Sequence, residues 1–400
     1  MEGASFPARG AKAGLRPGRT GTGVALGLAL ALACAHRQGP SDPPTDDLTK
    51  ALDALERKVC LTVGDRANGT TDQCEPHVDR STYLRPIREV FSAAPPILKA
   101  YLCSMDRFYF DYHAAWNAGF SVLPDSQTGR EYRSIGVRRG VLENKVRYAD
   151  WATAWTQHWW TGGPIDRPSN DPTLPRVEIE TRLGGPSGIL YHLLAHEVGH
   201  LLDREYGGGL GRRPEDKPFE PGEFGYLSWT LPRYAGANGI VHQAVARDSA
   251  LEAVRVLDFD GNVKARIAML AAAGNARFDP GALAVRNWQP ASRDGMATFL
   301  DRLDHSPFTT VFSTWRPEDD WTESFAAMML PSIARRFDIV TADGTRVRVL
   351  AKVLDDASPF APKRRFIQAA IDRALTDFRT RQAESPNPCL AVALADSLPH

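Results

Sequence analysis

The sequence predicts an α+β fold with a largely helical C-terminal part. Several segments carry apolar residues at helical spacing, and a few shorter segments between them alternate apolar and polar side chains as strands do. Of the 400 residues, 43% are hydrophobic and 24% charged, which is enough apolar surface for a packed core. The 48 basic residues balance 48 acidic ones, so the composition gives no reason to expect a nucleic-acid partner.

The N-terminal segment has the pattern of an export signal. Four basic residues precede an uncharged stretch at 23–35, which is too short to span a bilayer comfortably as a mature helix. The stretch ends in Leu-Ala-Leu-Ala-Cys at 30–34, which resembles a bacterial lipobox with two positions exchanged. In that interpretation residues 1–34 are the signal, Cys34 is lipidated, and the polar residues 35–47 form a tether. The alternative is an ordinary signal-peptidase site before Cys34. We therefore expect an exported protein, either held in the bacterial cell envelope by a lipid anchor only or secreted.

The cysteine count agrees with export. The chain has five cysteines, and assigning Cys34 to a lipid leaves an even number, which suits two disulfides in an oxidising compartment. Cys60 and Cys74 enclose a short polar loop, so we favour that pair. Cys103 and Cys389 would then join the C-terminal tail to the front of the domain. The sequence leaves the other two pairings open.

The remaining elements follow from periodicity and from breaks at Pro and Gly. The expected helices are 48–60, 84–104 with an interruption at Pro95-Pro96, 148–160 with buried tryptophans, 187–206, 242–273, 291–304, a helix from Pro317 to before Pro331, and 362–382. The expected strands are 132–142, 176–183, and 337–341 with 345–350, which Asp343-Gly344 joins as a hairpin. We divide the chain into an N-terminal helical segment (48–105), a core (106–330) with a long insertion (207–315), and a C-terminal hairpin and helix (331–400).

A motif with metal-binding spacing lies in the helix expected at 187–206. The run His196-Glu197-Val198-Gly199-His200 places two imidazoles on one face of a helix, as a tetrahedral zinc site requires. Glu197 lies about 100° around the axis, where it can act as general base without binding the metal. Zinc lowers the pKa of a bound water from about 15.7 to about 7, so this proton transfer is feasible at neutral pH. The helix is apolar over most of its circumference and should be buried, where unpaired histidines would be costly.

The third protein ligand must come from elsewhere in the chain. An extended motif with a third histidine fails, because Tyr206 stands where that histidine would be. We favour Glu323, which lies near the start of the helix after Pro317 and shares a side with two alanines that permit close approach. Asp319 and Asp320, in the first turn of the same helix, are the alternatives.

These two helices resemble the gluzincin branch of zinc metallopeptidases, and the acidic helix from Pro317 is similar to that of bacterial zinc-metallopeptidase lipoproteins. The resemblance covers about a tenth of the chain. It implies a zincin-like fold, in which a mixed β-sheet packs on the zinc-binding helix and an edge strand lines the substrate cleft; the strand at 176–183 is the candidate. About 120 residues separate the two helices, far more than in compact members, so the insertion must form structure of its own.

Other polar residues near the motif have less defined roles. Asp203 lies three residues after His200 and is either an outer partner of a ligand imidazole or a helix-end acid. His192, one turn before His196, has a structural role in the simplest interpretation. The group that stabilises the oxyanion stays open among several candidates. These are Tyr206, Tyr226, Tyr234 and His242.

The function that the resemblance implies is peptide-bond hydrolysis with one zinc ion per chain, with His196, His200 and Glu323 as ligands and Glu197 as general base. The substrate would be a protein or peptide. Two alternatives stay open: a non-catalytic envelope lipoprotein that uses the fold to bind a partner, and a zinc amidase acting on cell-wall material. The intact Glu197 disfavours the first, because a structural metal site needs no general base. The oligomeric state, the cleavage specificity and the presence of a pro-segment do not follow from the sequence.

Overall fold

The computed structural model describes residues 45–62, 74, 80–111, 118–124, 131–161, 165, 167–210, 219–231, 234–235, 241–242, 245–246, 293–314 and 316–395. The predicted signal segment, Cys34, the tether up to residue 44 and most of the helix expected at 242–273 lie outside these residues. No helix among the described residues is long and apolar enough to cross a membrane.

The elements alternate along the chain between helices and short strands. The helices are α1 (Thr45–Glu56), α2 (Ser81–Ala93), α3 (Pro96–Ser104), α4 (Arg139–Glu143), α5 (Tyr148–Thr161), α6 (Gly185–Leu202), α10 (Arg293–Asp304), α11 (Pro317–Met329), α12 (Val349–Leu354), α13 (Ala361–Glu384) and α14 (Pro388–Ala395). The strands are β1 (Val59–Thr62), β2 (Arg107–Asp111), β3 (Ala118–Pro124), β4 (Glu131–Arg138), β5 (Arg176–Thr181), β6 (Trp229–Leu231), β7 (Tyr234–Ala235), β8 (Val241–His242), β9 (Val245–Ala246), β10 (Ala334–Val340) and β11 (Arg346–Arg348). Short π or 3-10 turns are η1 (Asp203–Gly207), η3 (Gly225–Leu227), η5 (Phe312–Thr314) and η6 (Leu330–Ser332).

The strands form two main sheets. One has the order β1-β2-β4-β3, in which β1, β2 and β4 are parallel and β3 is antiparallel to β4. The other is antiparallel with the order β11-β10-β5. This mixture of helices with small sheets is compatible with the predicted α+β class.

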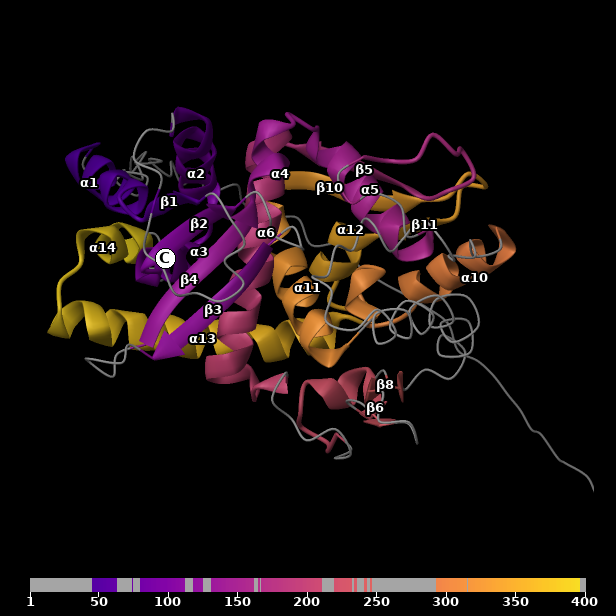
Figure 1. Cartoon of the computed structure of the whole chain (residues 1–400). Coiled ribbons are helices and arrows are strands. Elements are labelled where there is room, and N and C mark those ends of the chain that lie inside the picture. The colour runs from indigo at the N-terminus through magenta and orange to yellow at the C-terminus, as the bar shows by residue number, and fades with distance from the viewer. Residues whose placement is uncertain are drawn as a thin grey trace, which may run out of the picture. The chain divides into compact units, whose positions relative to one another are not determined.

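Helix α6 occupies the centre of this arrangement. It lies between the four-stranded sheet and α11, and α13 crosses near its C-terminal end (Figure 1). Ile189 and Tyr191, which point to nearly opposite sides of α6, are both fully buried, because sheet and helices surround it. The predicted burial of this helix is confirmed. Its contacts with β3 and with α11 bring together the polar groups of the candidate site.

Several local predictions are confirmed and three are wrong at least in part. The strand expected at 132–142 ends at Arg138, where α4 begins, and residues 242 and 245–246, at the start of the helix expected at 242–273, belong to strands β8 and β9. Pro95-Pro96 separates helix α2 from helix α3, as expected. Strands β10 and β11 form the hairpin expected around Asp343-Gly344. Trp151 is 1% exposed and stacks on Trp155, as expected for core tryptophans. The strand at 176–183 exists as β5, but it belongs to the sheet with β10 and leads into the start of α6. The edge strand beside the histidines is β3 instead, because β3 packs along α6 while β5 packs on α5.

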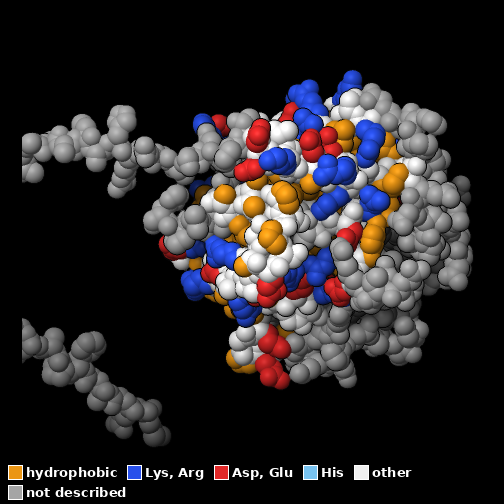
Figure 2. All heavy atoms as spheres, turned by 90° about the vertical axis from the view of Figure 1, so that its left-hand side faces the viewer, with side chains coloured by type: hydrophobic (Ala, Val, Ile, Leu, Met, Phe, Trp, Pro, Cys, Tyr) orange, Lys and Arg blue, Asp and Glu red, His pale blue; other side chains and the backbone are white. Residues whose placement is uncertain are grey.

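Both favoured disulfides are present. Cys60 bonds to Cys74 and Cys103 bonds to Cys389, the second joining α3 to α14. Residues 43–400 form one compact unit, so the N-terminal helices and the C-terminal helices belong to the same body as the central helix. On the side of this unit seen in Figure 2, basic and acidic side chains are interspersed.

Candidate metal centre

Helix α6 brings the three motif residues to one place. His196 and Glu197 are 9% and 5% exposed, and His200 is partly exposed, so the group opens to solvent on the His200 side. The two imidazole rings lie 5.0 Å apart. Two aromatic rings hold them in place: Phe120 of β3 stacks on His200 and Phe312 stacks on His196.

A third potential ligand comes from α11. One ring nitrogen each of His196 and His200 and one carboxylate oxygen of Asp319 lie within 4.8 Å of one another. Nε of Arg316 donates a hydrogen bond to Asp319 Oδ2 at 2.8 Å, which leaves Oδ1 for a metal. No other set of three potential ligands converges in the part of the chain that the structure describes.

Glu323, which the sequence favoured as third ligand, lies one turn further along α11 on the outer side of His196. Its Oε1 accepts a hydrogen bond from His196 Nδ1 at 2.9 Å, and its Oε2 accepts one from the Thr310 hydroxyl at 2.7 Å. Both carboxylate oxygens therefore already have donors. The acid that joins the two histidines is Asp319, the alternative from the first turn.

Close contact between α6 and α11 fixes the distance between these groups. A side chain at Gly199 would come within 2.9 Å of Thr322 Cα, so only glycine allows the two backbones to approach this closely. Trp321 Nε1 also donates to the Gly199 carbonyl at 3.0 Å. Because Gly199 lies inside the histidine motif, the same contact that packs the helices sets Asp319 opposite the histidines.

Asp320, the other alternative ligand, faces away from the histidines into the core. Lys363 of α13 binds its carboxylate at 2.5 and 2.6 Å, and Trp229 Nε1 donates to it at 3.0 Å. Asp320 and Lys363 are both fully buried. Burial raises the pKa of Asp320 and lowers that of Lys363 to about 8, with each partner opposing the shift of the other. This pair ties α11 to α13.

The two histidines have opposite pKa shifts. Burial lowers the pKa of His196, but the hydrogen bond to Glu323 and the surrounding carboxylates outweigh it and raise the pKa to about 9. Burial and the charge on His196 hold the pKa of His200 well below its usual range. Although burial alone would raise the pKa of Glu323, its contacts with His192 and His196 hold it well below the ordinary value. The negative charges that attract a proton to His196 equally attract a metal cation.

Glu197 lies between the histidines and β3. Burial raises the pKa of Glu197 to about 7, against the opposing charge of His196 and a smaller lowering effect of the nearby Phe120 backbone N–H. The strand that carries Phe120 pairs with β4 on one side, and among the described residues no strand pairs with its other side. A carboxylate, two imidazoles and a strand edge therefore meet at one place.

The remaining predicted residues are dispersed. Asp203 Oδ2 accepts the backbone N–H of Leu210 at 2.8 Å, which closes the turn after α6. The Tyr206 hydroxyl donates to Asp377 of α13 at 2.6 Å, which ties it to that helix rather than to the histidines. The side chains of Tyr234 and His242 lie outside the described residues, and the Tyr226 side chain is partly buried in the insertion.

The structure also adds residues that sequence reasoning did not select. Arg316 contacts Asp319, Thr310 contacts Glu323, and Tyr148 contacts His192. Arg316 directly precedes the acidic run, so its pairing three residues on had a local signal. The other two contacts join residues 13 and 44 positions apart, and no local pattern in the sequence pointed to them.

Comparison with known proteins returns no similarity on which to draw: no family model, curated protein or solved structure matches the chain. The class of site is defined by its donors alone, two imidazole nitrogens and a carboxylate oxygen beside a further buried carboxylate.

Proposed function

We propose that the protein is a zinc-dependent hydrolase, and within that class a peptidase. The observation that carries the proposal is the convergence of His196, His200 and Asp319 beside the buried Glu197. Three protein donors with one open position are the usual ligand set of a catalytic zinc, whereas structural sites are closed by four. In this assignment Asp319 takes the ligand place that the gluzincin resemblance gives to Glu323.

The donor set fits zinc on chemical grounds. Imidazole nitrogen and carboxylate oxygen are zinc ligands, and a neutral imidazole is the form that binds metal. The low pKa of His200 keeps that ring neutral at physiological pH, whereas His196, with its pKa raised to about 9, would release one proton as the metal binds. Arg316 hydrogen-bonds to Asp319, and Glu323 accepts a hydrogen bond from His196. Metal ligands commonly have such partners, which fix their orientation.

Each residue then has a separate task in hydrolysis. A zinc ion supplies a Lewis acid that polarises a carbonyl and acidifies water. Glu197 is placed to accept a proton from an attacking water and to return it to the leaving amine. The Phe120 N–H lies near the Glu197 carboxylate and favours its charged form, which is the form that accepts a proton. The partial exposure of His200 gives substrate an approach from the solvent side.

The position of β3 favours a peptide substrate over other amides. An extended peptide can pair with the outer edge of β3 through backbone hydrogen bonds. Such a strand would run directly past Glu197 and His200, because Phe120 at the middle of β3 contacts both. Two disulfides further support activity outside the reducing cytosol, where the predicted signal segment would send the chain.

The test separates metal binding from catalysis. Purified protein, dialysed against zinc and then against buffer, should retain one zinc per chain by elemental analysis. It should then cleave an unstructured protein such as casein, with activity lost to a chelator and restored by zinc. Glu197→Gln should retain the zinc and lose activity by at least ~100-fold, since general-base catalysis contributes about 10²–10⁴-fold.

Asp372→Asn is the control for the zinc measurement, because it removes the charge of an exposed acid in α13 that is not among the potential metal ligands. Absence of zinc in the wild-type protein would overturn the whole proposal. Zinc binding without cleavage of any protein or peptide would favour the partner-binding alternative, and cleavage confined to cell-wall amides would favour the amidase.

A further inference from the structure

His192 lies on the same face of α6 as the metal-binding histidines, four residues before His196. It is 6% exposed, and neither ring nitrogen belongs to the group that gathers around the metal position. Its Nδ1 lies 3.0 Å from the Tyr148 hydroxyl, and its Nε2 lies 3.7 Å from Glu323 Oε1. The same Oε1 accepts the hydrogen bond from His196 Nδ1. Tyr148 and His192 thus connect to His196 through one carboxylate oxygen.

We propose that Tyr148 and His192 are positioning residues of the metal centre: through Glu323 they fix the proton of His196 on Nδ1 and so present its Nε2 to the metal. This inference rests on the proposed zinc function. It assigns a role to two buried groups that the hydrolytic mechanism itself does not use.

The direction of each hydrogen bond follows from Glu323. A carboxylate can only accept, so Nδ1 of His196 carries the proton of the 2.9 Å hydrogen bond. The His192 contact at 3.7 Å is longer than a hydrogen bond, but an N–H on Nε2 is still the orientation that the nearby carboxylate charge favours. A neutral His192 with its proton on Nε2 has a bare Nδ1, which can only accept. The Tyr148 hydroxyl is then the donor to Nδ1, and burial keeps that phenol protonated by raising its pKa. In the other neutral tautomer of His192, with the proton on Nδ1, the lone pair of Nε2 would face the negative Glu323 carboxylate.

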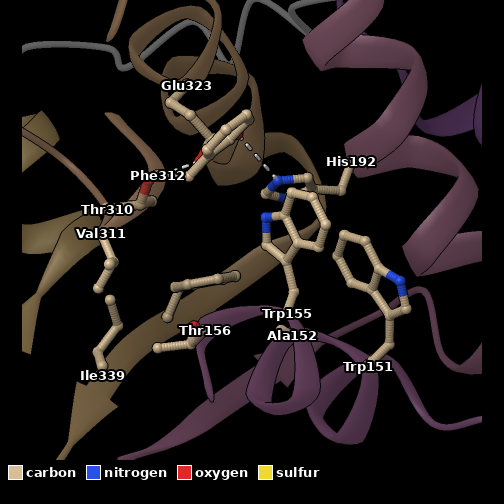
Figure 3. A pocket seen from close by; sticks show the side chains of 11 residues that line it. Trp151, Ala152, Trp155, Thr156, His192, Thr310, Val311, Phe312, Glu323 and Ile339 are labelled. Carbon is tan, nitrogen blue, oxygen red and sulfur yellow. Dashed lines mark hydrogen bonds and ion pairs between the residues drawn. The ribbon is translucent and has the colours of Figure 1, made fainter. Parts of the chain in front are cut away.

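The apolar surroundings strengthen the polar contacts between Tyr148, His192 and Glu323. Figure 3 shows His192 and Thr310 approaching the Glu323 carboxylate from two sides, with Trp155 beside them. The remaining lining of this small pocket is almost entirely apolar, so few solvent dipoles compete with the chain of contacts. Apolar or aromatic residues in the lining are Trp151, Ala152, Trp155, Val311, Phe312, Phe337 and Ile339.

A glycine permits the first contact of the chain. A side chain at Gly188, one turn before His192, would come within 2.7 Å of the Tyr148 ring and equally close to the Leu183 carbonyl. With glycine there, Tyr148 lies flat against α6 and its hydroxyl reaches His192. Glycine destabilises a helix interior, but at position 188 of α6 it leaves the space that the Tyr148 ring occupies.

The experiment measures zinc affinity by competition with a chelator, and the visible spectrum of the cobalt-substituted protein. Glu323→Gln should weaken zinc by about 10–100-fold, as loss of an outer partner commonly does. His192→Leu should weaken it by about 10-fold and Tyr148→Phe by about 3-fold, because they act one and two contacts further out. The cobalt absorption bands should shift in all three, which a purely structural role would not cause.

Rescue and coupling sharpen the test. His192→Gln keeps an N–H near the Nε2 position and should recover most of the affinity that His192→Leu loses. The double variant Tyr148→Phe/His192→Leu should bind zinc no more weakly than His192→Leu alone, because Tyr148 acts through His192.

Ile339→Val is the matched control, since it lines the same pocket without a polar group and should change stability only. The inference is overturned if His192→Leu and Tyr148→Phe bind zinc as the wild type does, or fall only as far as this control. Wild-type protein that binds no zinc would instead overturn the proposed function on which the inference rests.

Discussion

Asp319 and Asp320 are adjacent acids in α11, both almost fully buried, yet they face two different regions of the molecule. Asp319 faces the histidines of α6, where its partners are Arg316 and the proposed metal. Asp320 faces the core, where Lys363 binds it permanently. The side toward α6 is here called the metal side, and the side toward α13 the lysine side.

The difference shows that burial of a carboxylate does not by itself reveal its function. Removing a charge from water is costly on either side, and each side needs a compensating positive charge. On the lysine side the compensating positive charge is Lys363 of the same chain, so the Asp320 charge contributes to the structure. Among the described residues, Arg316 is the permanent cation that contacts the acids of the metal side, and the proton that these acids attract to His196 can be replaced by a metal, so an exchangeable cation has a place there.

The largest expected effect is on the metal side. Asp319→Ala should reduce zinc affinity by more than the ~100-fold that loss of an outer partner costs, because it removes a direct ligand. Chelator competition measures this, and the unfolding temperature of the metal-free variant serves as its control. If Glu323→Ala lost more zinc affinity than Asp319→Ala, the ligand would be Glu323. Asp319 would then not differ from Asp320 by binding the metal.

On the lysine side the expected effect is on stability. Lys363→Met should lower the free energy of unfolding by about 3–5 kcal/mol, because it leaves Asp320 buried without its cation. The double variant Asp320→Asn/Lys363→Met should recover much of this loss, since no isolated charge remains. Denaturant unfolding of the metal-free proteins provides the numbers. Equal stability of the single variant and the wild type would show that the pair is not a structural tie.

A smaller effect concerns a second buried lysine, Lys352, which donates to the carbonyls of Leu303 and Phe308. Burial lowers its pKa to about 7, below about 10.4 in an unfolded chain. Between these values the unfolded state binds one more proton, so this group makes stability rise with pH, by at most ~1.4 kcal/mol per unit.

The measurement is the difference in unfolding free energy between wild type and Lys352→Met at pH 7 and pH 8. The wild type should gain on the variant as pH rises, because only the wild type contains the lysine whose pKa is lowered on folding. A difference that stays constant, or that falls, would mean that Lys352 remains charged in the folded protein at pH 8.

The sequence was informative where one local rule determined the structure. Paired prolines separated α2 from α3, Asp343-Gly344 turned the hairpin, and apolar residues around α6 indicated its burial. The strands β1 to β3 were missed, because β1 and β2 are short apolar runs without regular alternation and β3 is interrupted by Gly119. Their pairing depends on long-range contacts that no local period encodes.

The site was predictable to the same extent. The spacing of His196 and His200 specified one helix face, but Asp319 and Glu323 are also four residues apart and share a face of α11. Helical periodicity cannot say which of two such acids stands level with the histidines. The register of the two helices decides it, and that register depends on the contact of Gly199 with Thr322.

The disulfide between Cys103 and Cys389 closes a covalent ring that contains both α6 and α11. A single cut by any protease between these cysteines, including one within the long connection that separates the two helices, therefore opens the ring without releasing a fragment. The nicked chain would still migrate as one species without reductant and as two with it. For an enzyme proposed to work among other proteases, this ring means that one cleavage leaves both halves of its metal centre in the same molecule.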